Sequence, residues 1–250
     1  MIDGPRASAI GHGEMPFHNP ISESAVDTLI GLLPLGAGDR ALDVGCGRGE
    51  LLIRLAEATG AHGFGLDSSA AQIARARHEA SSRLPAAEMH FETRDGGTLV
   101  APAGSFALAA CVGSSHALGG LGPTLERLTE LVRPGGHVVL GEGYWIRPPL
   151  PAELEALGAA EDELPDLAGL LSAGDAHGLR PVYLASATDE DWRRYEWAYV
   201  LNLETYAAAN PDEPGIEAVR DRAEFARSRR LLAAEHGESL GFALVCWQRA

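Results

Sequence analysis

The stretch ALDVGCGRGE, residues 41–50, sets the strongest constraint on how this 250-residue chain can fold. An apolar run carrying one aspartate leads directly into three glycines within five positions. Glycines so close together are unfavourable inside either a helix or a strand, so they predict a sharp turn between the two. The following ELLIRLAEATG has helical periodicity and ends in glycine, which is typical of a helix C-terminus. Residues 40–60 therefore predict a strand, a glycine-rich turn and a helix.

The alternation of strand-like and helix-like segments continues as far as residue 145. Helical periodicity is found at 21–33, 69–83 and 124–136, the last closed by Pro-Gly-Gly. Short apolar segments predict further strands at 61–67, 88–95, 105–113 and 137–145. Strands and helices that alternate at this pace indicate βαβ units, in which helices cover both faces of a parallel sheet.

The pattern changes after residue 146. The next thirty residues or so are acidic and rich in proline, which predicts a loop with short helices. The remaining segments are predicted as a strand (180–187), two helices (189–209 and 212–237) and a final apolar strand (239–249).

Charge and composition exclude several classes of protein. With 20 basic and 35 acidic residues the formal charge is −15, which disfavours nucleic acid and anionic membranes as partners. Every basic residue is an arginine, so chemistry that needs a lysine amine is excluded. The cysteines, Cys46, Cys111 and Cys246, are odd in number and widely spaced, so we expect reduced thiols and no metal site. A signal peptide and an apolar run of ~18 residues are both lacking, so a cytoplasmic protein is expected.

Glycines and acidic residues follow the first three predicted strands. In an open parallel sheet, ligands bind at the carboxyl ends of the strands, where backbone at Gly45 and Gly47 can approach a small molecule closely. The spacing GxGxG differs from the dinucleotide fingerprint GxGxxG. Asp43 would repel a pyrophosphate but suits a ligand with an amino group. Asp67 can accept hydrogen bonds from ribose hydroxyls, and Asp95 can meet an adenine amino group.

Five segments resemble, in order, the motifs of class I S-adenosylmethionine-dependent methyltransferases: ALDVGCGRGE, GFGLDSS, FETRDGG, FALAACVGSSHALGG and LVRPGGHVVLGEGYW. GEGYWIRPP and DEDWRRYEW are also similar to a bacterial branch that acts on small molecules. The resemblance implies a Rossmann-like α/β fold with a seven-stranded, mostly parallel sheet in the order 3-2-1-4-5-7-6 and helices on both faces. It implies a single methyltransferase domain, 1–250, with the cofactor core at 20–145 and helical cap elements for the substrate at 146–178 and 188–236.

The resemblance also implies which residues bind S-adenosyl-L-methionine. Those that match the family's motifs are Asp43, Gly45, Cys46, Gly47, Asp67, Ser68, Asp95, Gly96 and Cys111. Structural alternatives stay open, because Asp67 could cap the following helix and Asp95 could be a turn residue before two glycines. Many relatives have an aspartate where this chain has Ala107, a departure that we expect to affect packing rather than chemistry.

The methyl acceptor needs residues of its own. Methyl transfer from a sulfonium is an in-line displacement in which the protein mainly aligns the reactants. A hydroxyl, thiol or ammonium acceptor also requires a base, for which the candidates are His116, Glu142 and Tyr144, with His18 if the N-terminal segment folds over the site. His116 is favoured because histidine titrates near neutrality, although it could instead cap a helix or line a wall. Glu142 could equally be a structural carboxylate.

Aromatic residues lie along one face of the predicted helix at 189–209. Trp192, Tyr195 and Tyr199 have helical spacing, and they either pack against the sheet or form a wall over an apolar or cationic acceptor. We therefore predict methyl transfer to a small molecule. The alternatives are a non-catalytic protein that binds S-adenosylmethionine and, with less support, a nicotinamide-dependent dehydrogenase.

Overall fold

The computed structural model describes residues 2–250, which form two compact units. The first, here called the sheet unit, comprises residues 21–143, 167–186 and 242–250. The second, here called the helical unit, comprises residues 2–20, 144–166 and 187–241.

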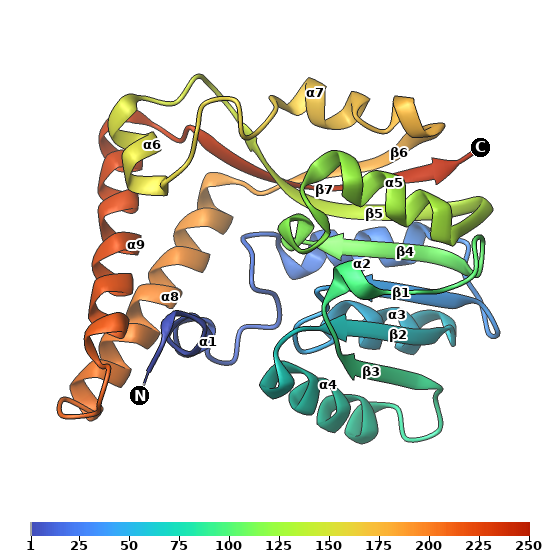
Figure 1. Ribbon diagram of the computed structural model, residues 1–250, viewed down its shortest axis with the longest axis horizontal. Coiled ribbons are helices and arrows are strands. Elements are labelled where there is room, and N and C mark those ends of the chain that lie inside the picture. The colour runs from blue at the N-terminus through green and yellow to red at the C-terminus, as the bar shows by residue number, and fades with distance from the viewer. Residues whose placement is uncertain (1) are drawn as a thin grey trace. The chain divides into compact units, whose positions relative to one another are not determined.

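A seven-stranded sheet is the centre of the sheet unit (Figure 1). Its strands lie in the order β3 (Met89–Thr93), β2 (His62–Asp67), β1 (Arg40–Val44), β4 (Phe106–Val112), β5 (Val132–Trp145), β7 (Leu240–Arg249) and β6 (Leu179–Ser186). The pairs β3–β2, β2–β1, β1–β4 and β4–β5 are parallel, and β6–β7 is antiparallel. The predicted Rossmann-like class and strand order are confirmed. The carboxyl ends of β1 and β4 meet at the point where strand order reverses.

Three helix ends of the sheet unit have clear capping residues. Figure 1 shows α2 behind the strands and α5 in front of them. Ser22 and Ser69 cap α2 and α4 through their hydroxyl groups, and α3 ends at Gly60 in the left-handed conformation. The helices are α2 (Glu23–Leu32), α3 (Glu50–Thr59), α4 (Ala70–Arg83), α5 (Leu121–Leu131) and α7 (Leu167–Ser172), with 3-10 turns η1 (Gly96–Thr98), η2 (Ser115–Leu118) and η3 (Asp175–His177).

The helix predicted at 124–136 is displaced toward the N-terminus in the structure. α5 ends at Leu131, and Val132 already pairs with Phe106 as the first residue of β5. The Pro-Gly-Gly that was expected to close the helix instead forms an excursion within β5, because the register passes from Val132 opposite Phe106 to His137 opposite Leu108. Gly135 has a φ of 75°, which only glycine adopts at little cost.

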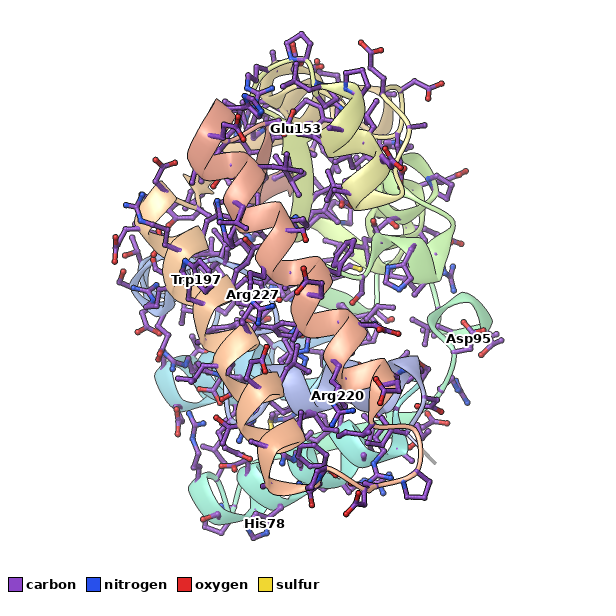
Figure 2. The ribbon with its side chains drawn as sticks, turned by 90° about the vertical axis from the view of Figure 1, so that its left-hand side faces the viewer. His78, Asp95, Glu153, Trp197, Arg220 and Arg227 are labelled. Atoms are coloured by element: carbon purple, nitrogen blue, oxygen red, sulfur yellow. The ribbon has the colours of Figure 1, made fainter. Side chains whose placement is uncertain are left out.

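The helical unit packs α1 (Gly4–His12) against α8 (Asp189–Ala209) and α9 (Glu217–His236), with a short α6 (Pro151–Leu157) beside α9. Figure 2 shows α8 and α9 side by side. Their buried core includes Ala7, Leu203 and Val219. α1 was not predicted, although Asp3 accepts a hydrogen bond from the Arg6 N–H and thereby caps it. α9 begins later than predicted because residues 211–216 form a turn.

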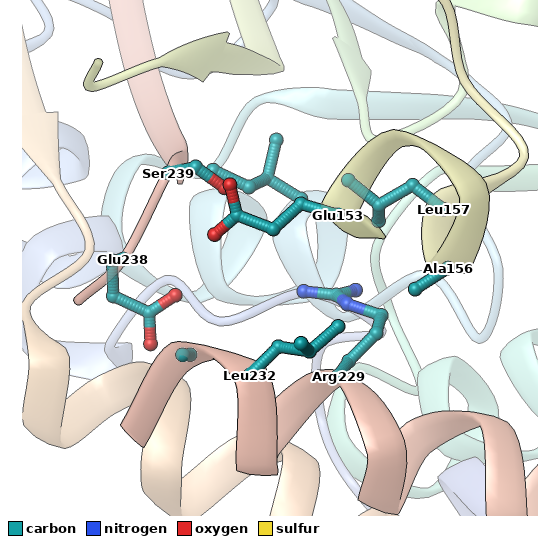
Figure 3. A pocket seen from close by; sticks show the side chains of 9 residues that line it. Glu153, Ala156, Leu157, Arg229, Leu232, Glu238 and Ser239 are labelled. Atoms are coloured by element: carbon teal, nitrogen blue, oxygen red, sulfur yellow. The ribbon is translucent and has the colours of Figure 1, made fainter. Parts of the chain in front are cut away.

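Buried ion pairs join α8 and α9 within this unit. Glu196 contacts Arg229 at 3.0 Å and Arg230 at 2.9 Å, the second contact being poorly aligned for a hydrogen bond. Arg230 also pairs with Glu238. Figure 3 shows a cavity between α6 and α9, lined in part by Arg229, Glu238 and Glu153. Its volume of about 20 Å³ has room for a single water molecule, so it does not accommodate a substrate.

We expect Glu196→Ala to lower the free energy of unfolding by about 3 kcal/mol, because it removes the buried partner of Arg229 and leaves Arg230 with Glu238 alone. The matched control is Glu190→Ala on the same helix, whose carboxylate is 74% exposed and pairs with Arg193. The control substitution should lower the free energy of unfolding by less than about 0.5 kcal/mol. Urea unfolding of both variants provides the measurement, and equal losses would show that the buried pairs are not stabilising.

Candidate cofactor site

The turn between β1 and α3 is held open by three glycines with positive φ. Gly45, Gly47 and Gly49 have φ angles of 75°, 52° and 78°. A Cβ at Gly45 would lie 2.4 Å from the Cβ of Ser114, and one at Gly49 would lie 2.6 Å from the ring of Phe91. At Gly47, in contrast, no described atom lies within 4 Å of that position. The turn is therefore packed on the Gly45 and Gly49 sides and open at Gly47.

Asp67, the last residue of β2, fixes this turn. Its Oδ2 accepts a hydrogen bond from the Gly47 N–H at 2.9 Å, and its Oδ1 accepts one from the Ser69 N–H at 2.8 Å. The N–H groups of Gly45 and Cys46 donate to the Leu66 carbonyl. Each carboxylate oxygen of Asp67 retains capacity for a further hydrogen bond. Asp67 thus braces the turn and can still accept hydrogen bonds from hydroxyl groups, while Ser69 caps α4.

Asp43 is a buried carboxyl without a full set of partners. It is 3% exposed, and its Oδ1 has no hydrogen-bond partner among residues 2–250. Burial, followed by the charge of Asp67, raises the pKa of Asp43 to about 7. A buried carboxylate oxygen of this kind needs a donor or a cation. The Oδ1 of Asp43 is suited to accept a hydrogen bond from the amino group of S-adenosylmethionine. Together with the open backbone at Gly47, this oxygen makes the edge of the sheet suitable for that cofactor.

The third strand brings Gly96 to the same edge. A Cβ at Gly96 would lie 2.6 Å from the Cγ1 of Val44 at the end of β1, so this position requires glycine. Asp95 is exposed, as Figure 2 shows, and its Oδ1 accepts a hydrogen bond from the Gly97 N–H at 2.9 Å. It therefore caps the 3-10 turn that follows β3. Ser68 is also exposed.

Acidic groups from β1 and β5 lie on either side of Cys111 in β4. Burial, and then the charges of Asp43 and Glu142, raise the pKa of the Cys111 thiol. The thiols of Cys46 and Cys246 are also buried and their pKa values are raised, mainly by burial. All three cysteines are free and serve as protonated, buried side chains.

Two of the predicted acceptor-side residues, Glu142 and His116, are close enough for their charges to interact. Glu142 interacts with the Ser115 hydroxyl and accepts a hydrogen bond from the Gly143 N–H at 3.1 Å. Burial raises the pKa of Glu142, whereas Ser115, Gly143 and the nearby His116 act to lower it. Its Oε2 is buried and has no hydrogen-bond partner within the described chain. His116 itself is exposed on η2.

The other two candidates belong to the helical unit. Tyr144 is 7% exposed, and its ring packs so closely on Gly241 that a Cβ there would lie 2.3 Å away. His18 stacks on His12 with 4.1 Å between ring centroids. Sequence reasoning did not single out His12, the partly buried last residue of α1, which contacts Tyr195 and Tyr199 of α8, because an isolated histidine in a short helix carries no distinctive signal. Gln72 on α4 was also missed, and its Oε1 is buried without a partner in residues 2–250.

No group of three or more histidine, cysteine or acidic side chains in residues 2–250 is placed to hold a metal ion. Over the same residues, no helix combines the length and apolar character needed to span a membrane.

Comparisons with known proteins agree with this geometry. Residues 41–136 match a family model described as a methyltransferase domain. The chain is 34% identical over 247 residues to the uncharacterized protein YjhP of Escherichia coli, covering 98% of this chain and 99% of YjhP, and a crystal structure of YjhP superposes with a TM-score of 0.89.

Two further solved structures are S-adenosylmethionine-dependent methyltransferases in complex with S-adenosyl-L-homocysteine. The proteins from Thiobacillus denitrificans and Geobacter sulfurreducens are 30% and 31% identical, with TM-scores of 0.88 and 0.89 and all of both chains covered. The 27-O-demethylrifamycin SV methyltransferase of Amycolatopsis mediterranei is 37% identical over 130 residues, about half of each chain (52% and 47%).

The fold, the glycine turn and these relatives define the class of protein. The chain belongs to the class I S-adenosylmethionine-dependent methyltransferases, and S-adenosyl-L-methionine is its cofactor. The family, the enzyme class and the cofactor predicted from the sequence are confirmed, which removes the nicotinamide alternative. The roles of individual site residues stay predictions.

The raised pKa of Asp43 predicts a pH dependence of stability. The unfolded chain loses this proton near its ordinary pKa of 3.8, whereas the folded chain keeps it until about pH 7. The folded chain therefore binds more protons over this interval, and the free energy of unfolding falls as pH rises, by about 4 kcal/mol at most. Asp43→Asn should abolish this loss in urea unfolding between about pH 4 and pH 8.

The control for this experiment is Asp221→Asn, which removes an exposed carboxylate on α9. Its unfolding free energy should follow the wild-type pH dependence. If the free energy of unfolding depended on pH in the same way in the wild type and in Asp43→Asn, Asp43 would have its ordinary pKa in the folded chain.

Proposed function

We propose that this enzyme transfers the methyl group of S-adenosylmethionine to a small-molecule acceptor by in-line displacement. The observation that carries the proposal is the set of groups at the carboxyl ends of β1 and β2. They are the Oδ1 of Asp43, which has no hydrogen-bond partner among residues 2–250, the open backbone at Gly47 and the fixed carboxylate of Asp67. A curated relative is by name a methyltransferase of a small molecule, 27-O-demethylrifamycin SV. The formal charge of −15 also disfavours a nucleic acid as acceptor.

The proposed cofactor-binding roles follow from these positions. When bound, S-adenosylmethionine supplies a methyl group already activated on a sulfonium. Asp43 accepts hydrogen bonds from the amino group of the cofactor, close to the turn of Gly45 and Gly47. Asp67 accepts hydrogen bonds from the ribose hydroxyls. The remaining predicted positions, Cys46, Ser68, Asp95, Gly96 and Cys111, are proposed to line the same edge.

His116 is proposed as the base that takes the proton of the acceptor. It is exposed on η2, directly after β4, and can therefore meet a ligand from solvent. Glu142 lies near enough to His116 to interact with its charge, and it positions the imidazole and stabilises the imidazolium that forms. Tyr144, on the same strand as Glu142, is a third candidate for the base, although its close packing on Gly241 favours a structural role.

The acceptor itself is proposed to bind against the elements predicted as a cap. The helical unit contains 187–241, which includes the aromatic face of α8. Trp192 and Tyr199 are buried, and Tyr195 is partly buried and contacts both rings. Tyr195 and Tyr199 are the residues we expect to influence acceptor affinity while leaving cofactor affinity unchanged.

The test is a panel of small-molecule acceptors assayed by release of S-adenosylhomocysteine, together with calorimetry of S-adenosylhomocysteine binding. We expect His116→Ala to lower kcat by about 100-fold or more, because it removes the base, while the Kd of S-adenosylhomocysteine changes less than about twofold. His78→Ala, an exposed histidine on α4 labelled in Figure 2, is the control and should leave both quantities unchanged. Equal losses of turnover and cofactor affinity in His116→Ala would rule out the catalytic role.

A further inference from the structure

Three large apolar side chains of the helical unit are exposed on one side of the α8–α9 pair. Trp197 of α8, labelled in Figure 2, is 44% exposed, and Leu201 of the same helix is 65% exposed. On α9, Leu231 is 60% exposed. Single apolar residues on a surface are ordinary, whereas a contiguous group that includes an aromatic ring indicates an interaction site. We call these three side chains the α8–α9 patch.

The members of the patch are neighbours on the surface. The two on α8 are four residues apart, so their side chains lie one above the other on the helix. Because only residues 210–216 connect α8 to α9, the two packed helices run antiparallel. Glu204 of α8 pairs with Arg227 of α9, and Leu231 lies one helical turn beyond Arg227. Leu231 is therefore level with the interval between the two apolar residues of α8.

The patch is the centre of a longer stripe along α8. Positions 190, 194, 197, 201, 204 and 208 are separated alternately by four and three residues, so their side chains share one side of the helix. In order they are Glu190, Arg194, Trp197, Leu201, Glu204 and Ala208. Tyr199, two residues from Trp197, lies on the other side of α8, where it contacts His12 of α1. The stripe is therefore apolar in the middle, charged on either side of the middle, and directed away from α1.

The charges of this stripe complement a second copy of the same stripe that runs in the opposite direction. A two-fold axis midway between Trp197 and Leu201 places each of these residues against the other one in the second copy. The same axis places Arg194 opposite Glu204, and Glu190 opposite the neutral Ala208. A parallel pairing would instead place each charge against itself.

The two charged positions can take a partner from outside the chain. Within one copy, Arg194 pairs with Asp191 and Glu204 pairs with Arg227. The side chains of Arg194 and Glu204 are nevertheless 60% and 49% exposed. A guanidinium has five N–H groups and a carboxylate has two oxygens, so each group can form a further contact.

We propose that the α8–α9 patch is the interface of a symmetric homodimer, in which the α8 helices of two copies pack antiparallel across a two-fold axis. Helices of 21 and 20 residues lying side by side present a face of about 30 by 20 Å, or about 600 Å² per copy. Both copies together bury about 1,200 Å², which is the lower limit for a specific interface. The dimer is therefore weak and reversible.

A second copy of the chain fits this face better than a lipid surface does. Helices that lie on membranes carry mainly basic residues beside their apolar face, whereas this stripe contains Glu190 and Glu204. Two copies that each have a formal charge of −15 repel one another in general, so their association needs a local match of charges and apolar contact. The stripe supplies both. The proposed interface uses residues of the helical unit only and is independent of the proposed function.

The first experiment measures the mass of the full chain by sedimentation equilibrium over a series of concentrations. We expect the wild type to form a dimer with a Kd in the micromolar range. Leu201→Glu should weaken the dimer by about tenfold or more, because a carboxylate replaces an apolar contact at the centre of the interface. Leu32→Glu is the matched control, since Leu32 is 66% exposed on α2 of the sheet unit, and it should leave the Kd of the dimer unchanged.

The second experiment tests the two-fold pairing of charges. Arg194→Glu places two glutamates opposite one another and should weaken the dimer more than Arg193→Glu does. The control makes the same change of charge at the adjacent residue, which the axis places opposite the neutral Thr205. Glu204→Arg should weaken the dimer as well. An equimolar mixture of Arg194→Glu and Glu204→Arg should contain more dimer than either variant alone, because opposite charges face one another only in the mixed dimer.

Three outcomes would overturn the proposal. They are a wild type that stays monomeric at every concentration, a dimer that Leu201→Glu weakens no more than Leu32→Glu does, and a mixture that contains no more dimer than its separate components. A monomeric wild type that binds phosphatidylcholine vesicles would assign the patch to a lipid surface instead. Circular dichroism of each variant shows whether α8 and α9 still form, so that loss of the dimer is not confused with loss of the fold.

Discussion

The turn between β1 and α3 is the constraint on which the site depends. Its three glycines adopt left-handed φ angles, and the carboxylate of Asp67 holds the backbone of Gly47 in place. The lack of a side chain at Gly45 allows Ser114 to approach, so the turn after β4 packs directly on the turn after β1. Because η2 follows at once, this packing also places His116 at the edge of the sheet where Asp43 lies.

Buried charge is distributed in two ways in this protein. In the α8–α9 pair, Glu196 is matched by Arg229 and Arg230, and such a network serves the structure. At the sheet edge, Asp43 and Glu142 each keep a buried oxygen without a partner in the described chain. Buried polar groups that lack a hydrogen-bond partner in the free protein are places where a ligand can supply the missing hydrogen bond. The contrast separates ion pairs that stabilise the fold from buried carboxyl oxygens that have no partner among residues 2–250.

The sequence predicted much of the architecture because strands and helices alternate with clear periods. The strand order and the ends of β1, β2 and α8 agree with the prediction. The predicted end of the helix at 124–136 was wrong. Pro-Gly-Gly is a local signal for the end of a helix, whereas in the structure the helix ends earlier because Val132 pairs with Phe106. α1 was missed because it has nine residues, and contacts with α8 and α9 stabilise it more than its own pattern does.

The sequence by itself determined the fold class, the glycine turn and the acidic residues that follow the strands, since these depend on backbone angles and spacing along the chain. Its resemblance to a known family indicated the cofactor. The tertiary structure alone decided that burial raises the pKa of Asp43 to about 7 and that Glu142 is close enough to His116 for their charges to interact. Charge states and pairings of this kind depend on burial and on groups far apart in the chain. No local pattern of residues encodes the distances between such groups.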